Sequence, residues 1–584
     1  MQALHRKDPD TAMAGSLKQD LSRSTGSRSA GYRAADRMHA LLAGLGPGST
    51  AFVSHPEPTS FGDPARGRQL LAGNHLINGE IIAAPGLSLW DVAADAPGLD
   101  AMMLHDFKWL DDLAALGTKP ARELAQRWLS DWITRYGRGR GPGWTPDLTA
   151  RRIMRWISHT VLLLGADGSA LAPRYFRSLS HQTVFLSRRW RTAASGRPRF
   201  EALCGMMYAG LSLSGFEDKV AAASKALDQA CRREIDAQGA LASRNPEDML
   251  DVLSLLTWVA EAVEARGLPP SLEQAKAITR MAPSLRALRH RDGTLLRGHG
   301  GGRGAPGHLK GALARTGVAG LSEAPSVMGF ARLAAGGTTV LIDAATPPRG
   351  AAALSAHAST LAFEMTSGVH PLIVSCGPAT GFGPEWRRAA RATASHSTLE
   401  LDGLSSSRLI TRARKPGEIE ALAQVPTRVT VEIYDGPLGM SGRLMTHDGY
   451  DASHGLTHAR QMELDGAGRV LSGTDTLAAL SEGAHLRCDR AAAGTRGTGL
   501  PYSLRFHLAP DVEAEIDMGG TAVSLVAGEG EVWIFRARGA ELRLAPSVVL
   551  ERDRLKPRAT RQIVLAGHVQ DYAVEIGWSL TRAT

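Results

Sequence analysis

The sequence predicts an all-helical N-terminal half joined to an antiparallel β-sheet half that begins near Met328. Up to about Arg291, apolar residues recur at the three- and four-residue spacing of helices, and after Met328 they alternate with polar residues. The length of 584 residues exceeds that of one ordinary core, so two or more domains are expected. These observations together predict a chain of two parts with different secondary structure.

Helix starts are marked at Thr145–Asp147 and at Asn245–Asp248, where an N-cap residue, a proline and an acidic residue follow one another. Apolar stripes follow: Ile153, Trp156, Ile157, Val161 and Leu164 after the first, and Leu250, Leu253, Leu256, Val259 and Val263 after the second. Further helices are predicted for residues 104–110, 121–136 and 214–239. Stripes this broad indicate helices that pack together as hairpins in a bundle or ring.

Between the halves the helical pattern stops. The glycine-rich run Gly298–Gly304 lacks the Gly-Lys-Ser/Thr ending of a phosphate-binding P-loop, which favours a linker or flexible loop. We therefore expect a disordered tail at residues 1–30, a helical domain at 31–291, a linker at 292–327 and a sheet domain at 328–584.

The sheet half shows strict alternation at 361–366, 429–434 and 503–508. Residues 465–468 and 518–520 have the glycine-rich composition of hairpin turns. Many short strands with one apolar face predict a large antiparallel sandwich.

Composition restricts the classes of protein. The sequence is 43% apolar and 21% charged, as in globular proteins, and no apolar run is long enough to insert into a membrane. Residues 1–28 have no apolar segment of a secretory signal, which favours the cytoplasm, with the periplasm or cell envelope as the alternative. The four scattered cysteines favour buried thiols over a disulfide framework or a zinc ribbon.

The net charge of +9 favours a polyanionic partner, which charge alone leaves open between nucleic acid, phospholipid headgroups and acidic polysaccharide. Binding of nucleic acid rests on this charge only, because the sequence has no helix-turn-helix or base-stacking motif. We therefore expect no nucleic-acid partner. The sequence does not predict the oligomeric state.

The segment 384–398 is dense in functional side chains. Trp386 lies beside Arg387, Arg388 and Arg391, which suits a sugar face flanked by carboxylates or sulfates, and His396 follows before a strand. The alternative interpretation is a basic loop over the sheet, with His396 hydrogen-bonded at a strand edge.

A metal site is a second candidate. His357, Cys376 and His396 are residue types that ligate metals, although their spacing matches no known ligand signature. A structural metal ion at these three residues is therefore one expectation, and hydrogen-bonded turns are the other.

Several motifs in order resemble the heparinase II/III-like polysaccharide lyases. They are Phe363–Gly368, Ile373–Gly377, the run from Trp386 through Arg391 to Thr398, His447–Tyr450 and, in the helical half, Gln238-Gly239 with Ser243–Pro246. The resemblance implies an incomplete (α/α) toroid followed by an antiparallel β-sandwich. It also implies a cleft between the domains that holds an acidic polysaccharide and requires no cofactor.

Such lyases break a uronate chain by β-elimination. A positive or hydrogen-bonding group neutralises the carboxylate, a base removes the C5 proton, and an acid protonates the leaving oxygen. The resemblance implies Arg244, Asn245 or Arg391 as the neutraliser and His357 or His396 as the base. The residues expected to contact substrate are Trp386, Arg387, Arg388 and Glu201.

The chain departs from the family pattern at three places. Ser355 stands where a first histidine precedes His357, residues 248–250 lack the expected tyrosine, and residues 197–200 lack an Asn-His pair before Glu201. Two hypotheses follow. The chain is a carbon–oxygen lyase that cleaves uronate-containing polysaccharide, or it is an inactive relative that binds a cell-envelope acidic glycan.

Overall fold

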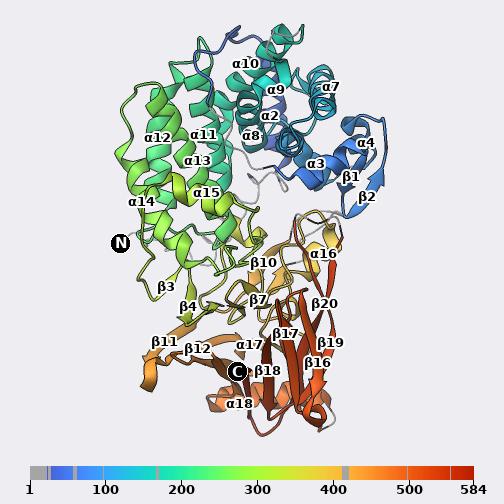
Figure 1. Cartoon of the computed structure of the whole chain (residues 1–584), viewed down its shortest axis with the longest axis vertical. Helices are drawn as coiled ribbons and strands as arrows, with labels where there is room; N and C mark the ends of the chain where they lie inside the picture. Colours follow the sequence, from blue (N-terminus) through green and yellow to red (C-terminus); the bar gives the residue numbers. More distant parts are fainter. Residues whose placement is uncertain are drawn as a thin grey trace, which may run out of the picture.

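The computed structural model describes residues 23, 28–56, 62–96, 98–165, 170–410, 420–495, 497–552, 554 and 556–583. The predicted tail at residues 1–30 lies almost entirely outside these ranges. The described chain forms a helical half that stands on a sheet half (Figure 1).

The helical half runs through a series of α-helices. Their bounds are α2 (Ala30–Ala43), α3 (Pro64–Leu71), α4 (Leu89–Asp95), α5 (Leu99–Met103), α6 (Lys108–Ala114), α7 (Lys119–Tyr136), α8 (Pro146–Ser158), α9 (Thr160–Leu164), α10 (Ala172–Arg189), α11 (Arg197–Ser212), α12 (Lys219–Glu234), α13 (Pro246–Ala265), α14 (Leu272–Ala287) and α15 (His308–Arg315). The helix signals at Thr145 and Asn245 start α8 and α13.

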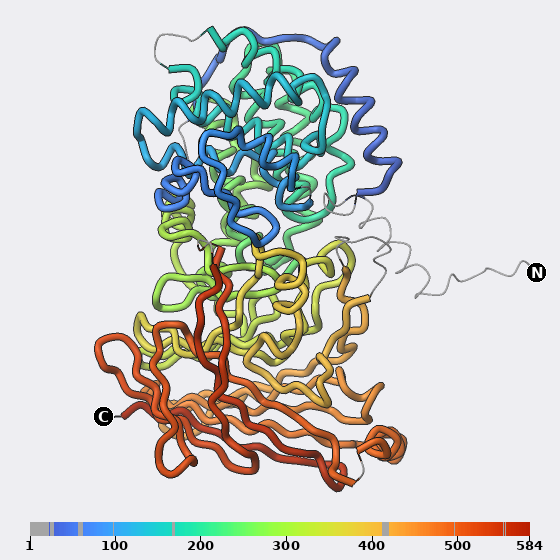
Figure 2. The backbone as a smooth tube through the Cα atoms, turned by 90° about the vertical axis from the view of Figure 1, so that its right-hand side faces the viewer, coloured from blue at the N-terminus to red at the C-terminus, as the bar shows by residue number. Residues whose placement is uncertain are grey.

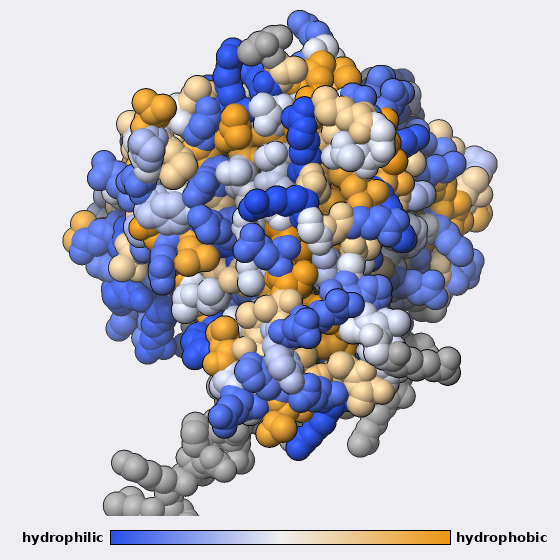
Figure 3. Space-filling model, turned by 90° about the horizontal axis from the view of Figure 1, so that it is seen from below, coloured by the Kyte–Doolittle hydropathy of each residue, from blue (hydrophilic) through white to orange (hydrophobic). Residues whose placement is uncertain are grey.

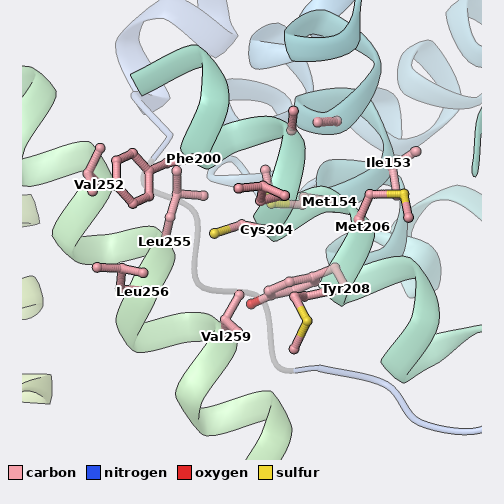
Figure 4. Packing of buried hydrophobic residues seen from close by; sticks show 14 of the residues in the cluster. Ile153, Met154, Phe200, Cys204, Met206, Tyr208, Val252, Leu255, Leu256 and Val259 are labelled. Atoms are coloured by element: carbon pink, nitrogen blue, oxygen red, sulfur yellow. The ribbon is translucent and has the colours of Figure 1, made fainter. Parts of the chain in front are cut away.

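The centre of this half is formed by α8, α11 and α13. Helix α11 is buried on nearly every side, because α8, α12 and α13 all pack against it. Figure 4 shows Phe200, Cys204 and Tyr208 of α11 among Leu255 and Val259 of α13. A helix without a solvent face can present polar residues only to an internal cavity, and Glu201 on α11 is such a residue.

The sheet half contains these strands and helices: β3 (Ser326–Val327), β4 (Phe330–Ala335), β5 (Thr338–Asp343), β6 (Phe363–Ser367), β7 (His370–Ile373), α16 (Pro384–Ala389), β8 (Leu399–Leu401), β9 (Arg408–Ile410), β10 (Ala421–Gln424), β11 (Val429–Asp435), β12 (Ser441–Tyr450), α17 (Asp451–His454), β13 (Leu456–Leu464), β14 (Val470–Ala478), α18 (Glu482–Ala492), β15 (Leu500–His507), β16 (Val512–Asp517), β17 (Ala522–Ala527), β18 (Glu531–Arg538), β19 (Glu541–Val549), β20 (Arg558–Val569) and β21 (Ala573–Arg582). The turns predicted at 465–468 and 518–520 join β13 to β14 and β16 to β17.

Three larger antiparallel sheets make up this half. Their strand orders are β3-β4-β5-β6-β7, β11-β12-β13-β14-β21-β18-β17-β16 and β19-β20-β15-β8. The sheets meet in one apolar core, where Phe363 of the first stacks on Trp578 of the second at 5.6 Å between ring centroids. Phe506 of the third sheet meets Trp578 edge-on at 5.0 Å. Aromatic contacts of this kind join sheets whose strands lie far apart in sequence.

The hairpin β19–β20 reaches from the sheet half up to the helical half, as the red tube in Figure 2 shows. Near its tip, the backbone carbonyl of Arg552 accepts a hydrogen bond from Arg66 Nη1 at 2.9 Å. Arg552 Nη2 donates to the carbonyl of Gly300 at 3.1 Å, within the predicted linker. The glycine-rich run therefore packs between the halves, and helix α15 lies in the same segment.

The helical N-terminal part and the antiparallel C-terminal part confirm the predicted fold class. Two local differences stand out. Leu361 has φ +63° and precedes β6 instead of belonging to it. A hairpin of β1 (Asn74–Ile77) and β2 (Glu80–Ala83) also lies in the helical half, and its Asn78-Gly79 turn is the local sequence signal for it.

All four cysteines are buried free thiols, as predicted. Among the described residues, no helix is long and apolar enough to cross a membrane. Seen from the sheet end, hydrophilic and hydrophobic residues are interspersed over the surface (Figure 3).

Candidate functional site

A cleft of about 1940 Å³ lies between the two halves. The helical half contributes Arg197, Arg244 and Asn245, and the sheet half contributes Arg349 and His357, among others. Nine arginines and six carboxylates line the cleft, which leaves an excess of three positive charges. Clefts that carry an excess of one charge concentrate ligands of the opposite charge.

Arg244 joins the halves at the floor of the cleft. Its backbone has φ +50°, and its side chain extends from the helical half into the sheet half. The guanidinium donates to the carbonyls of Met328, Gly329, Ala345 and Thr346 at 2.8–3.1 Å and pairs with Asp343. These partners use its nitrogens, so the predicted neutraliser holds the two halves together.

Asn245 caps α13. Its side-chain oxygen accepts hydrogen bonds from the backbone N–H groups of Glu247 at 2.9 Å and Asp248 at 3.2 Å. The residue is buried at the edge of the cleft. Its carbonyl oxygen is thus committed to the helix start.

Arg391 lines the cleft, but its guanidinium is also occupied by backbone. It donates to the carbonyls of Ala356 at 2.8 Å, Ala353 at 2.8 Å and Glu420 at 2.6 Å. Burial lowers its pKa to about 10. Arg391 therefore fixes the segment that leads into His357.

His357 and His396 form a buried pair. His357 Nδ1 lies 3.2 Å from His396 Nε2, and His396 Nδ1 lies 3.1 Å from Ser375 Oγ. Burial, with the neighbouring positive charges, holds the pKa of His357 well below its usual value and lowers the pKa of His396 to about 4. Both rings are therefore neutral near pH 7. Only His357 lines the cleft, and His396 lies beneath it.

The structure does not assemble the metal set that the sequence suggested. Cys376 Sγ lies 3.5 Å from His507 Nδ1, with Ser547 Oγ at 4.0 Å, and burial raises its pKa to about 11. His357 and His396 are at hydrogen-bonding distance from each other. Within the described ranges, no group of three or more His, Cys, Asp or Glu residues is arranged to hold a metal ion. The three residues therefore do not form one ligand set, since the Cys376 thiol contacts His507 and Ser547 while His357 and His396 contact each other.

The other residues predicted to contact substrate do not all lie in the cleft. Arg387 and Arg388 line the cleft from α16, but Trp386, on the same helix and 39% exposed, is not among the lining residues. Glu201 lies deeper, in a chamber that adjoins the cleft. It pairs with Arg151 at 2.9 Å and Arg197 at 3.3 Å, and burial raises its pKa to about 7 against the effect of both arginines.

Sequence reasoning missed Arg349 and Arg552. Arg349 is exposed in the cleft and makes no hydrogen bond or ion pair with any residue in the described part of the chain. Arg552 reaches the cleft from the β19–β20 turn and pairs with Glu247 at 3.0 Å. Neither carried a local signal, because each lies in a loop whose position depends on the whole fold.

Comparison with known proteins agrees with this architecture. Residues 320–579 match the family profile described as Heparinase II/III-like, C-terminal. The FtsZ-localized protein C of Caulobacter vibrioides is 30% identical over 546 residues, which span 92% of this chain and 90% of that protein. The chain belongs to the heparinase II/III-like family.

Solved structures show the same fold. A structure of heparinase III matches with a TM-score of 0.63 and 12% identity, covering 100% of this chain and 93% of that one. The heparan sulfate lyase HepC of Pedobacter heparinus, in a mutant form, matches with a TM-score of 0.54 and 14% identity over 94% of this chain and 88% of its own. At these identities the likeness concerns the fold alone.

Proposed function

We propose that this protein binds an acidic, uronate-containing polysaccharide in the cleft and cleaves it by β-elimination. The observation that supports this most directly is His357. Its ring is neutral, its Nδ1 is engaged by His396, and its Nε2 has no partner among the described residues while the side chain lines the arginine-rich cleft. A neutral imidazole nitrogen facing a polyanion site is suited to accept a proton.

The elimination then runs as follows. Arg349, an exposed arginine of the same cleft, pairs with the uronate carboxylate and makes the C5 proton more acidic. His357 Nε2 takes that proton, the released electron pair forms the C4=C5 double bond, and the C4–O4 bond breaks. The leaving oxygen takes the proton back from the imidazolium. No atom is gained or lost, and the product is an unsaturated sugar.

The test is an elimination assay on the intact chain. Heparin, heparan sulfate, alginate, hyaluronan and polygalacturonate are each incubated with the protein while ultraviolet absorbance is followed. We expect absorbance to rise with at least one of them. We also expect His357→Ala to lower the rate by about 10²–10⁴-fold. His568→Ala, an exposed histidine on β20, is the matched control. A flat trace with every glycan, from folded protein, would exclude the lyase activity.

A second candidate function is recognition of an acidic glycan without cleavage. It is favoured by Arg244 and Arg391, whose guanidinium nitrogens are occupied by backbone carbonyls and are not free to neutralise a substrate carboxylate. Ser355, in place of the expected first histidine, points the same way. Binding to an array of acidic glycans, together with a flat elimination trace, would favour this candidate.

The location of the protein is a separate proposal. The relative from Caulobacter vibrioides is named for its localisation with FtsZ, and it shares 30% identity across 92% of this chain. We propose that this chain also gathers where FtsZ assembles. A fluorescent fusion imaged beside labelled FtsZ tests this, and an even distribution through dividing cells would contradict it.

A further inference from the structure

A second cavity of about 430 Å³ lies in the helical half and adjoins the cleft. The two cavities share Asp100, Met103, Arg197, Thr380 and Arg552 in their linings. We call this second cavity the inner chamber. Its volume falls in the range of about 300–1,000 Å³ that small-molecule sites occupy.

The arginines of the inner chamber are matched by carboxylates of the protein. The pairs are Arg66–Asp112 (3.9 Å), Arg151–Glu201 (2.9 Å), Arg155–Asp111 (2.8 Å), Arg197–Asp251 (2.7 Å) and Arg552–Glu247 (3.0 Å). Most of the charge in this wall is therefore compensated internally.

Lys108 differs from these arginines. Its side chain lines the inner chamber, and its Nζ makes no hydrogen bond or ion pair with any residue that the structure describes. The side chain is exposed into the chamber, where loss of bulk water and the nearby Arg66 and Arg552 lower its pKa, while Glu247 and Asp112 act in the opposite direction from beyond ion-pair distance. Because this ammonium is exposed to the cavity and has no partner in the described structure, it is available to pair with an anionic ligand.

The backbone just before Lys108 is held in an unusual conformation. Phe107 has φ +65°, is fully buried, and occupies the position before the first turn of α6. A left-handed conformation is rare for a bulky residue and persists only where packing fixes it. Phe107 is fixed by aromatic neighbours, with Trp109 at 4.7 Å and Trp156 at 5.4 Å between ring centroids. The start of α6, and with it Lys108, is thus set rigidly at the chamber wall.

His75 provides an independent sign of a ligand. It is 2% exposed and lines the same chamber, and neither of its ring nitrogens has a hydrogen-bond partner in the described structure. Burial lowers its pKa, so the ring is neutral and has one donor and one acceptor to satisfy. Buried polar groups of this kind are normally hydrogen-bonded. A ligand rich in hydroxyl groups would meet the requirement.

We propose that the inner chamber binds one acidic sugar unit, whose carboxylate or sulfate pairs with Lys108 and one of whose hydroxyls hydrogen-bonds to His75. The unit is the end of the chain held in the cleft, so the inference rests on the proposed function and deepens it. Trp109, Tyr208 and Trp258 also line the chamber, and aromatic walls suit the apolar face of a sugar ring. A polysaccharide that ends in the inner chamber would be bound there by its terminal sugar unit.

The experiment is isothermal titration of the intact protein with glucuronate, glucosamine 6-sulfate and uncharged glucose. We expect an acid to bind more tightly than glucose, and the acid that binds identifies carboxylate or sulfate as the recognised group. Lys108→Met should weaken that binding by about tenfold or more, and Lys108→Arg should restore part of it. Lys225→Met, an exposed lysine on α12 outside both cavities, should change nothing.

Equal binding of glucose and the acids, no binding of any, or unchanged affinity in Lys108→Met would each overturn the inference. Elimination of the polysaccharide is measured in parallel, so that loss of the sugar site and loss of the lyase activity are seen separately. If Lys108→Met does not fold, acetylation of the wild-type lysines decides. Protection of Lys108 by the sugar acid, read by mass spectrometry, supports the site, and unchanged labelling excludes it.

Discussion

Arg391 shows how an arginine in a binding cleft can serve the scaffold. Two of its three contacts with backbone carbonyls are buried and the third is partly buried, and removing the side chain leaves these carbonyls without this donor. We expect Arg391→Ala to lower the stability of the sheet half by about 2–4 kcal/mol, seen as a lower melting temperature.

Arg388, three residues earlier, is the matched control. Its guanidinium is 59% exposed and pairs with Glu420 at the surface. Arg388→Ala should change stability by no more than about 0.5 kcal/mol. Equal melting temperatures for the two variants would show that Arg391 is not a structural residue.

The raised pKa of Glu201 predicts how the stability of the folded chain depends on pH. Its carboxyl has a pKa of about 7 in the folded chain, above the ordinary value of 4.5, chiefly because of burial. A raised acid pKa means that the folded state binds more protons, so its contribution to stability falls as pH rises from about 4.5 to about 7. Relative to Glu201→Gln, the wild-type chain should lose about 3 kcal/mol across that window.

Melting temperatures of both chains at pH 5 and pH 8 give the measurement. Relative to Glu201→Gln, the wild-type chain should have a lower melting temperature at pH 8 than at pH 5. A difference that stays constant with pH would mean that Glu201 ionises at an ordinary pKa in the folded chain.

At the scale of single elements, substitutions of Asn245 at the start of α13 can distinguish a structural role from a role in glycan binding. Asn245→Ala removes the N-cap and should cost about 1 kcal/mol, whereas Asn245→Asp keeps a side-chain oxygen for the cap. The aspartate also adds a negative charge to a cleft that is proposed to hold a polyanion. We therefore expect Asn245→Asp to retain the melting temperature and to weaken glycan binding, as titration would show. Weakened stability in both variants would point to a role for the amide nitrogen instead.

The elements could be predicted because their signals are local. The proline and the cap at Asn245 start α13, and the alternation at 429–434 gives β11. The site could be predicted only in outline. The partners of Arg391 lie up to 38 residues away, those of Arg244 up to 102, and Arg66 meets Arg552 across 486. Which nitrogens remain free for a substrate is decided by these distant carbonyls, and no spacing in the sequence records them.

At the scale of the whole molecule, the cleft exists because two separately built cores meet. The helical core extends to Val327, Met328 and Phe330 of the first sheet, so the halves share apolar contact as well as charge. Arg244 crosses this boundary, stacks over Phe330 at 4.9 Å and pairs with Asp343, which also lies 3.4 Å from His299. Arg244 therefore both joins the two halves and lines the cleft.

This arrangement predicts that the halves unfold together only while Arg244 is present. Removing it leaves Asp343 as a buried carboxylate and four carbonyls without their donor, which should cost about 3–5 kcal/mol at the boundary. Calorimetry of Arg244→Ala should then show two separated transitions where the wild-type chain shows one. Arg232→Ala, an exposed cleft arginine that pairs with Glu273 at 3.8 Å, should leave the trace unchanged. A single, unshifted transition in Arg244→Ala would mean that the apolar boundary alone couples the two halves.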